Sequence, residues 1–599
     1  MASKELLDNQ FLYLSHLLTE QLNTDGFWTG RLASSALATS VAMVALKLHK
    51  NTGFEEKIDS GLRWIFANVN NDGGFGDTPE SKSNVSTSLL CYAAISYCCY
   101  DESLRKNVLS GIENYFETQQ IRFDSNYLTS SVLKFYGHDY TFSVPILSML
   151  VICGVLNEEA CNRIPQLPFE FTLLPASWYR FFKLEVVSYA IPALVAVGIF
   201  IFRKRTKGNS LFRFIRQKSI APALKKLTEM VPESGGFLEA IPLTAFVCMA
   251  LMAVNTDCPA VIKKGMIFLE KQQRPDGSWS IDTDLSTWVT TLSIKALGLK
   301  LYQSLSVESV ETLKAHLLNI QYKEKHPFNG SKPGGWGWTN YTGSVPDADD
   351  TSGAIIALLQ MYTGKNEETE AIINGCKWLI GLQNSDGGFP TFCKGWGRLP
   401  FDSSSADLTG HAFAAFILTL EKLRDKLSPQ LYKSFFKNAV KASDFLRKAQ
   451  HSNGYWLPLW FGNQHTSDQT NPVYGTAKVS IYLEDCISCK CLSESLKYTL
   501  EQMLDKALIY LVAQQNNDGS WGGAIDRKPS IEETSLAIGA LVSSNDSACI
   551  RGLSWLEDET KNHKFTSAPI GLYFAALWYD EAMYPLIYYI EALRRFLNK

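Results

Sequence analysis

The sequence predicts an all-α protein built from two barrels of paired helices. One short phrase recurs along the chain: an apolar helix end, then Gln, a polar turn with Asp-Gly or Asn-Gly, and an aromatic residue. Between its copies lie apolar helical stretches such as ATSVAMVALKL and TGHAFAAFILTL, while strand-like segments are scarce. Helix pairs closed by a repeated turn bury their apolar faces against neighbouring pairs, so an α/α barrel of the α6-α6 toroid type is expected.

The copies of the phrase show where each helix pair turns. They are QLNTDGFW from Gln21, NVNNDGGF from Asn68, QQRPDGSW from Gln272, LQNSDGGF from Leu382, AQHSNGYW from Ala449 and QQNNDGSW from Gln514. Asp-Gly and Asn-Gly supply the positive φ that ends one helix and starts the next. The copies are sparse between residues 121 and 256. We therefore predict one barrel over residues 30–295 and a second over residues 296–599, completed by residues 1–29.

Composition and charge exclude several classes of protein. The chain has 599 residues and a net charge of -3, and its Lys and Arg residues are scattered, so nucleic acid is not expected as a partner. The 13 Cys lack a paired spacing and the N-terminus has no apolar core typical of a secretory signal, which favours reduced thiols and a cytoplasmic chain. Cys486, Cys489 and Cys491 in CISCKC have a metal-compatible spacing without a second ligand pair, so structural thiols are favoured.

One apolar segment departs from the pattern of a soluble protein. Residues 186–202, VVSYAIPALVAVGIFIF, carry no charge and are followed by Arg203, Lys204, Arg205 and Lys207. The segment is shorter than the roughly 20 residues of a spanning helix. It fits an element that dips into one leaflet and holds the basic residues at the headgroups. A buried core helix explains the hydrophobicity equally well.

The sharpest local signal is the acidic segment SVPDADDTSGAIIALL, which contains Asp347, Asp349 and Asp350. Crowded carboxylates resist full ionisation, and burial leaves one of them as a neutral acid able to donate a proton. The alternative is capping of a helix N-terminus, where acidic side chains interact favourably with the helix dipole. That dipole opposes a raised pKa, so the catalytic interpretation requires burial and partners.

The repeated phrase resembles the QW motif of squalene-hopene and oxidosqualene cyclases, and this resemblance extends over nearly the whole chain. In that family the glutamine ties a helix end to the next repeat and the tryptophan stacks beside it. The resemblance therefore implies a scaffold role for Gln272, Trp279, Gln514 and Trp521.

The acidic segment resembles the DXDD motif of class II terpene cyclases. By this resemblance the middle residue, Asp349, is the proton donor, supported by Asp347 and Asp350. The stretch SADLTGHAF is similar to the family segment whose histidine hydrogen-bonds the donor. This implies that His411 is the partner of Asp349, with Asp407 at the matching acidic position. Without that context a lone histidine near an apolar face is ordinarily a core residue.

Aromatic residues are frequent, with 14 Trp, 25 Tyr and 33 Phe. Their faces stabilise positive charge but are poor nucleophiles, so a cavity lined by them suits a carbocation cascade. For any single ring, ordinary core packing is the alternative. The resemblance implies the following substrate-lining residues: Trp288, Trp338, Phe392, Trp460, Tyr474, Tyr573 and Tyr579.

The sequence also departs from the family pattern. FSVPIL, residues 142–147, stands where hopene cyclases carry a cavity tryptophan. Phe75 and Phe389 replace tryptophan in two copies of the repeat, and the loop between Trp460 and Tyr474 is longer than in the family. These departures affect the expected product more than the protonation step.

Together these resemblances imply an enzyme that protonates squalene and folds it into a pentacyclic triterpene of the hopene type, without a cofactor. The stretch 167–195 is similar to the substrate channel and membrane-inserted helix of hopene cyclases. A membrane-channel segment is therefore predicted at about residues 167–207, on a protein that is monotopic or peripheral at the cytoplasmic face of the membrane. Formation of a homodimer is left open.

Three alternatives accompany this expectation. One is a cyclase for another polyprene or for a polyprenyl diphosphate, which would make use of Mg²⁺ an open question. Another is a noncatalytic helical toroid that binds isoprenoid lipids and uses the aspartates only as caps. The third is a protein prenyltransferase β subunit, which shares the barrel but needs a zinc site of Asp, Cys and His that the sequence does not reveal.

Overall fold

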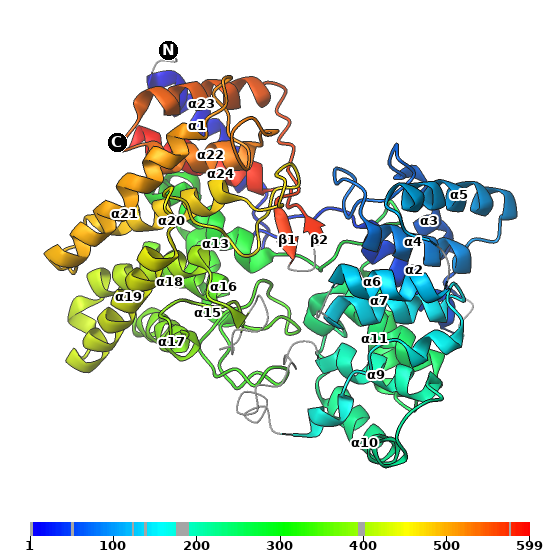
Figure 1. Ribbon diagram of the computed structural model, residues 1–599. Coiled ribbons are helices and arrows are strands. Elements are labelled where there is room, and N and C mark those ends of the chain that lie inside the picture. Colours follow the sequence, from blue (N-terminus) through cyan, green and yellow to red (C-terminus); the bar gives the residue numbers. More distant parts are fainter. Residues whose placement is uncertain are drawn as a thin grey trace.

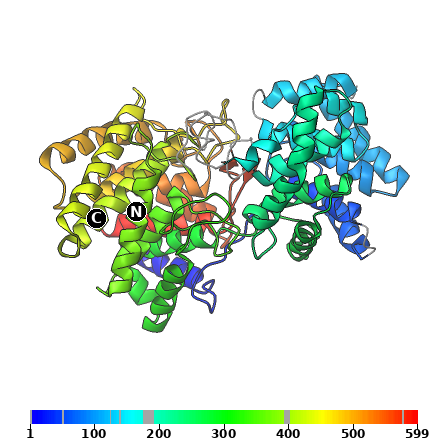
Figure 2. The same cartoon turned by 90° about the horizontal axis from the view of Figure 1, so that it is seen from below.

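The structure is almost entirely helical. The computed structural model describes residues 4–49, 53–122, 125–136, 140–174, 191–392, 402–573 and 577–599. Within these ranges the only strands are one short antiparallel pair, which confirms the all-α prediction. The helices form two barrels that lie side by side (Figures 1 and 2).

The larger barrel is a closed double ring. Among the described residues six helices form its inner ring, each packed against its neighbours and the last against the first. The inner helices are α13 (Ser286–Leu297), α16 (Ala348–Gln360), α18 (Ala406–Lys422), α20 (Pro472–Ile487), α22 (Ile531–Leu541) and α24 (Tyr584–Leu597). The outer helices are α1 (Lys4–Thr19), α15 (Val307–Ile320), α17 (Asn366–Leu382), α19 (Pro429–Ala449), α21 (Glu494–Ala513) and α23 (Asp546–Glu559).

The smaller barrel is closed in the same way by fewer helices. In the described part of the chain its inner ring is α2 (Ala36–Leu48), α4 (Val85–Cys98), α7 (Tyr140–Ile152), α9 (Ile191–Lys204) and α11 (Ile241–Ala253). Its outer helices are α3 (Glu55–Ala67), α5 (Glu102–Thr118), α6 (Ser125–Tyr136), α10 (Ser210–Glu229) and α12 (Pro259–Lys271). Helix α13 packs against α16 and α24, so the chain passes from one barrel to the other before Ser286, whereas the sequence-based division falls at residue 295.

Short elements connect the rings. These are the helix α14 (Leu301–Ser304) and the 3₁₀ helices η1 (Glu158–Asn162), η2 (Phe169–Leu173), η4 (Phe237–Glu239), η5 (Gly298–Lys300) and η7 (Arg424–Lys426). Strands β1 (Gly571–Tyr573) and β2 (Leu577–Tyr579) pair with Gly571 opposite Tyr579. The strand pair lies where the two barrels face each other (Figure 1).

The repeated turns hold neighbouring helix pairs together through a glutamine and a tryptophan. Gln273 Nε2 donates to the carbonyl oxygens of Lys57, in the adjacent helix, and Gly277, in its own turn, at 2.8 and 3.0 Å. Trp279 Nε1 donates to the carbonyl of Leu269, which satisfies an end of the preceding helix at 2.7 Å. Each repeat is therefore tied both to its own helix end and to the next repeat.

The bridging glutamines are Gln273 and Gln515, one position after the predicted Gln272 and Gln514. The bridging residue precedes the turn glycine by four residues, as Gln515 precedes Gly519, because only there does the amide reach across the turn. Trp521 takes the predicted scaffold position, donating from Nε1 to the carbonyl of Leu511 at 2.8 Å.

The segment predicted to dip into a membrane is in part a core helix. In the described part, residues 191–202 of α9 are all buried and pack against α7, α10 and α11. The membrane-dip interpretation is therefore wrong for these residues, whose apolar side chains are used by the inner ring; residues 186–190 lie outside the described part. Among the described helices none combines the length and apolarity that crossing a bilayer requires.

We expect Gly277→Ala to destabilise the scaffold. Gly277 has φ +90°, and a Cβ there would lie 2.4 Å from the carbonyl oxygen of Ser60 in the adjacent helix. Strain of this kind costs about 1–3 kcal/mol, so the apparent Tm should fall, as measured by thermal unfolding followed by circular dichroism. Gly381→Ala is the matched control, since nothing lies within 4 Å of its Cβ position. Equal melting of the two variants would contradict the expectation.

Candidate active site

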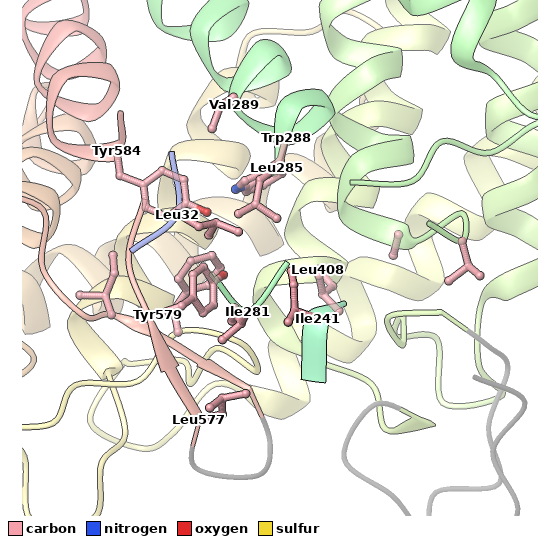
Figure 3. Close-up of a cluster of buried hydrophobic side chains, with 14 of the residues drawn as sticks. Leu32, Ile241, Ile281, Leu285, Trp288, Val289, Leu408, Leu577, Tyr579 and Tyr584 are labelled. Carbon is pink, nitrogen blue, oxygen red and sulfur yellow. The ribbon is translucent and has the colours of Figure 1, made fainter. Parts of the chain in front are cut away.

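An apolar cavity of about 250 Å³ is lined by residues of both barrels. Leu90, Ile146 and Phe246 contribute from the smaller barrel, and Trp288 and Asp349 from the larger. Figure 3 shows part of this wall, where Ile281, Leu285, Trp288 and Tyr579 gather in one cluster. Among the described residues that line the cavity none is Lys, Arg or His. The space is therefore suited to a hydrocarbon chain.

Three carboxyl groups meet at the N-terminus of α16, at one end of this cavity. Asp347 caps the helix by accepting a hydrogen bond from the backbone N–H of Asp350 at 2.8 Å. Burial raises the pKa of Asp347 to about 8 and raises the pKa of Asp350 well above its usual range, helped by the charge of Asp347. Asp347 therefore caps the helix although its pKa is raised, because burial outweighs the effect of the helix dipole at Asp347 and Asp350.

Asp349 is the aspartate of this cluster that contacts a histidine. Its Oδ1 lies 2.6 Å from Nδ1 of His411 on α18, and its side chain is 19% exposed and lines the cavity. Burial lowers the pKa of His411, which favours a neutral imidazole. The His411 ring stacks on Tyr482 at 4.4 Å and meets the edge of Trp288 at 6.0 Å. The orientation of the imidazole is thus fixed on both sides.

Asp407 lies one turn before His411 on α18 and does not line the cavity. Ser405 donates a hydroxyl hydrogen bond to its Oδ1. Burial, followed by the negative charge of Asp349, raises the pKa of Asp407 to about 6. Asp407 therefore interacts electrostatically with Asp349 from outside the cavity lining.

Aromatic rings form a continuous wall beside the carboxyl groups. The ring of Phe392 lies 5.7 Å from that of Trp338 and 5.8 Å from that of Trp460, both in inclined arrangements. Trp460 Nε1 donates to the hydroxyl of Thr391 at 3.0 Å, which fixes the indole. With Trp288 and Tyr579, these rings place five of the predicted aromatic residues in the cavity lining.

Two predicted aromatic residues are placed differently. Tyr474 is fully buried behind Phe461, with ring centroids 4.3 Å apart, and its hydroxyl lies 3.1 Å from that of Tyr588. Phe461 lines the cavity instead, so the lining assignment of Tyr474 is corrected: α20 begins just before it and directs its ring into the barrel interior. Tyr573 ends strand β1, but its side chain lies outside the described part of the structure.

Several lining or neighbouring residues were not singled out from the sequence. Pro145 and Ile146, from the segment that departs from the family pattern, line the cavity. Lys478 and Tyr482 lie on the inner face of α20. The spacing of Tyr474, Lys478 and Tyr482 by four residues places one lysine on an otherwise aromatic helix face, and this signal was available in the sequence. In the described ranges no group of three or more His, Cys, Asp or Glu is arranged to bind a metal.

Comparison with known proteins agrees with this geometry. The family model of the squalene-hopene cyclase C-terminal domain matches residues 285–569, and that of the N-terminal domain matches residues 13–104. Together these matches cover more than half of the chain.

Three curated relatives illustrate the range of similarity. Enfumafungin synthase of Hormonema carpetanum is 25% identical over 57% of this chain, which spans only 28% of that protein. The squalene-hopene cyclase of Alicyclobacillus acidocaldarius is 26% identical over 76% of this chain and 75% of that protein. Sporulenol synthase of Bacillus subtilis is 24% identical over 74% of each. The chain belongs to the squalene-hopene cyclase family of class II terpene cyclases.

Proposed function

We propose that the chain protonates a terminal alkene of squalene, or of a related polyprene, and cyclises it to a pentacyclic triterpene of the hopene type. In the first step the O–H bond of Asp349 breaks and a C–H bond forms at the alkene, leaving a carboxylate and a tertiary carbocation. Ring closures then move the positive charge along the chain, until loss of a proton or capture of water ends the cascade.

The observation that carries this proposal is the position of Asp349. Its carboxyl group opens into an apolar cavity while His411 holds one of its oxygens at 2.6 Å. A hydrogen bond on one carboxyl oxygen leaves the other to hold the transferable proton. Burial of Asp347 and Asp350 keeps their pKa values raised, which limits the negative charge around the donor.

The lining of the cavity supports a hydrocarbon in preference to a diphosphate. Trp288, Trp338, Phe392 and Trp460 present aromatic rings that stabilise a cation without reacting with it. A diphosphate group would require cationic partners, and the described lining residues contain no Lys, Arg or His.

We expect Asp349→Asn to lose cyclisation by about 10²–10⁴-fold, because an amide cannot donate the proton. Detergent-solubilised protein would be incubated separately with squalene, its epoxide and shorter polyprenes, and the products separated by gas chromatography and mass spectrometry. Asp505→Asn, at an exposed residue of α21, is the matched control and should keep its activity. Absence of cyclic product from the unaltered protein with every substrate would favour a noncatalytic isoprenoid-binding toroid. Full activity of Asp349→Asn would show that a group other than Asp349 donates the proton.

We expect Asp347→Asn to stabilise the protein increasingly as the pH rises from 5 to 8. Folded Asp347 keeps its proton up to about pH 8, whereas in the unfolded chain it ionises near 3.8, so unfolding releases a proton in this interval. The free energy of unfolding of the unaltered protein should therefore fall by roughly 1 kcal/mol per pH unit, whereas that of the variant should not fall for this reason. Asparagine preserves the helix cap. Thermal unfolding across this pH range measures the difference in Tm. A difference that stays constant, as expected for exposed Asp425→Asn, would contradict burial of a neutral acid.

We also propose that the protein docks on a membrane surface through α10 and not through α9. Leu211, Phe212 and Phe214 are 65, 59 and 63% exposed at the start of α10, and Arg213 and the exposed Lys218 lie beside them. Apolar side chains of this kind enter the headgroup region of a bilayer while basic residues attract anionic lipid. Helix α10 lies at the lower end of the smaller barrel in the view of Figure 1. A surface of this kind would bring the cavity close to the lipid that stores a polyprene.

Replacement of both Phe212 and Phe214 by Glu should weaken vesicle binding by about 10-fold or more, since burial of each ring contributes about 1.5–3 kcal/mol. Flotation with phosphatidylcholine vesicles, with and without phosphatidylserine, measures the bound fraction. Tyr498→Glu with Ile509→Glu is the control, because these residues of α21 are 63 and 72% exposed elsewhere on the molecule. Equal loss in both double variants, or none in either, would overturn docking through α10.

A further inference from the structure

A lysine is buried beside the acid without a carboxylate partner. Lys478 is 4% exposed on the inner face of α20, and its Nζ has no hydrogen-bond partner among the described residues. Its ammonium group lies over three rings instead, 5.5 Å from the centroid of Trp288, 5.2 Å from Tyr482 and 5.5 Å from Tyr588. A buried unpaired charge is costly, so its presence in the barrel interior calls for an explanation.

The same rings connect Lys478 to the acid. Trp288 and Tyr482 both contact the imidazole of His411, which in turn holds Asp349. Lys478 itself is not part of the cavity lining, whereas Trp288 is. The ammonium group thus lies behind the wall, close enough to act through its electric field on Asp349 and His411 and too deep to touch substrate.

Other charges packed around Lys478 do not neutralise it. Lys295 of α13 pairs with Glu591 of α24 at 3.0 Å and with Asp485 of α20 at 3.6 Å. Arg595 of α24 pairs with Glu484 and Asp485. The remaining titratable groups that face Lys478 are Asp349 of α16, Asp407 and His411 of α18, Tyr482 of α20 and Tyr588 of α24. Among the carboxylates, Glu591 raises the pKa of Lys478 most and already pairs with Lys295, and Asp349 and Asp407 follow. The charge of Lys478 therefore acts on Asp349 as well as on Glu591.

We propose that Lys478 is a positioning residue that strengthens Asp349 as an acid: its ammonium group stabilises the carboxylate left by proton transfer and keeps His411 neutral. This inference rests on the proposed protonation chemistry. When Asp349 changes from neutral to negative, a nearby fixed cation favours the product of that change more than its starting state. The aromatic rings supply the cation–π contacts that make the unpaired ammonium group tolerable.

The position of the charge also favours progress of the cascade. Positive charge behind Asp349 opposes a carbocation that stays near Asp349 and favours one that has moved along the cavity. Recapture of the proton by the carboxylate is then disfavoured relative to ring closure. Lys478 assists both the release of the proton and the departure of the charge that the proton creates.

We expect Lys478→Met to lower kcat by about 10- to 100-fold with little change in KM, since the lysine does not contact the cavity. Its Tm should rise, because an unpaired buried charge is removed, whereas a purely structural lysine would lower it. The pKa of Lys478 is lowered to about 8, first by burial and then by Lys295, so kcat of the unaltered protein should fall above that pH. Lys478→Arg should restore kcat and move this fall to higher pH.

Titration of Asp347 is an alternative explanation for a fall in kcat above pH 8, because the pKa of Asp347 is also about 8. A fall in kcat that Lys478→Arg leaves in place would assign the titration to Asp347 and overturn the inference. Lys314→Met is the control for loss of a buried lysine: Lys314 is 2% exposed on α15 and pairs with Glu368 at 2.9 Å, away from the cavity. It should lower Tm and leave the pH dependence of kcat unchanged.

A measurement without substrate separates failure of this inference from failure of the proposed function. The protein would be labelled with ¹⁵N at histidine, and the His411 resonance would be identified by its loss in His411→Gln. This resonance should titrate at higher pH in Lys478→Met than in the unaltered protein, because one neighbouring cation is gone. An unchanged His411 titration would overturn the inference even with an active enzyme. A shifted titration in a protein that cyclises nothing would retain the electrostatic coupling and reject the cyclase.

Discussion

Burial of the carboxyl groups at the start of α16 is the constraint on which the rest of the site depends. A helix N-terminus in water stabilises ionised aspartate, which is a poor acid. Here desolvation reverses that preference at Asp347 and Asp350, whose pKa values are raised. Such burial costs free energy, and the closed ring of inner helices supplies the apolar packing that offsets it. The repeated turns therefore serve the site indirectly, because they hold closed the barrel that keeps water from the acids.

The electrostatics of the larger barrel are arranged along its depth. Lys295, Arg595 and their carboxylate partners lie beneath the aromatic layer, and Lys478 lies within it. His411 and Asp349 come next, and the mainly apolar cavity wall follows. The cationic side chains are thus kept out of the described cavity lining, while Asp349, from which proton transfer is proposed to begin, belongs to it. Beyond that end, aromatic quadrupoles are the main source of cation stabilisation.

Much of this arrangement was predictable from the sequence, because it rests on local patterns. The turn phrase predicts the helix pairs, and the acidic segment predicts the cap at Asp347. The contact of Asp349 with His411 crosses from α16 to α18, so residue patterns alone do not reveal it; the family resemblance pointed to it. The bridging role of Gln273 was missed because this residue lies in the turn beyond the end of α12, and the inward direction of Tyr474 was missed because it depends on the distant Phe461, which covers it. For residues 191–202, hydrophobicity alone does not distinguish a core helix from a membrane element.

In the proposed reaction, the protonation step and the shape of the product depend on different barrels. The acid, its histidine and the rings around them come from inner helices and loops of the larger barrel, whereas Pro145, Ile146 and Phe246 line the cavity from the smaller one. At the segment where the sequence departs from the hopene cyclase pattern, the wall is aliphatic. An aliphatic side chain stabilises a passing cation less than an indole does, and it leaves a different volume for the folded polyprene. In the proposed reaction the larger barrel therefore supplies the initiating acid, while the smaller barrel shapes the space in which the polyprene folds.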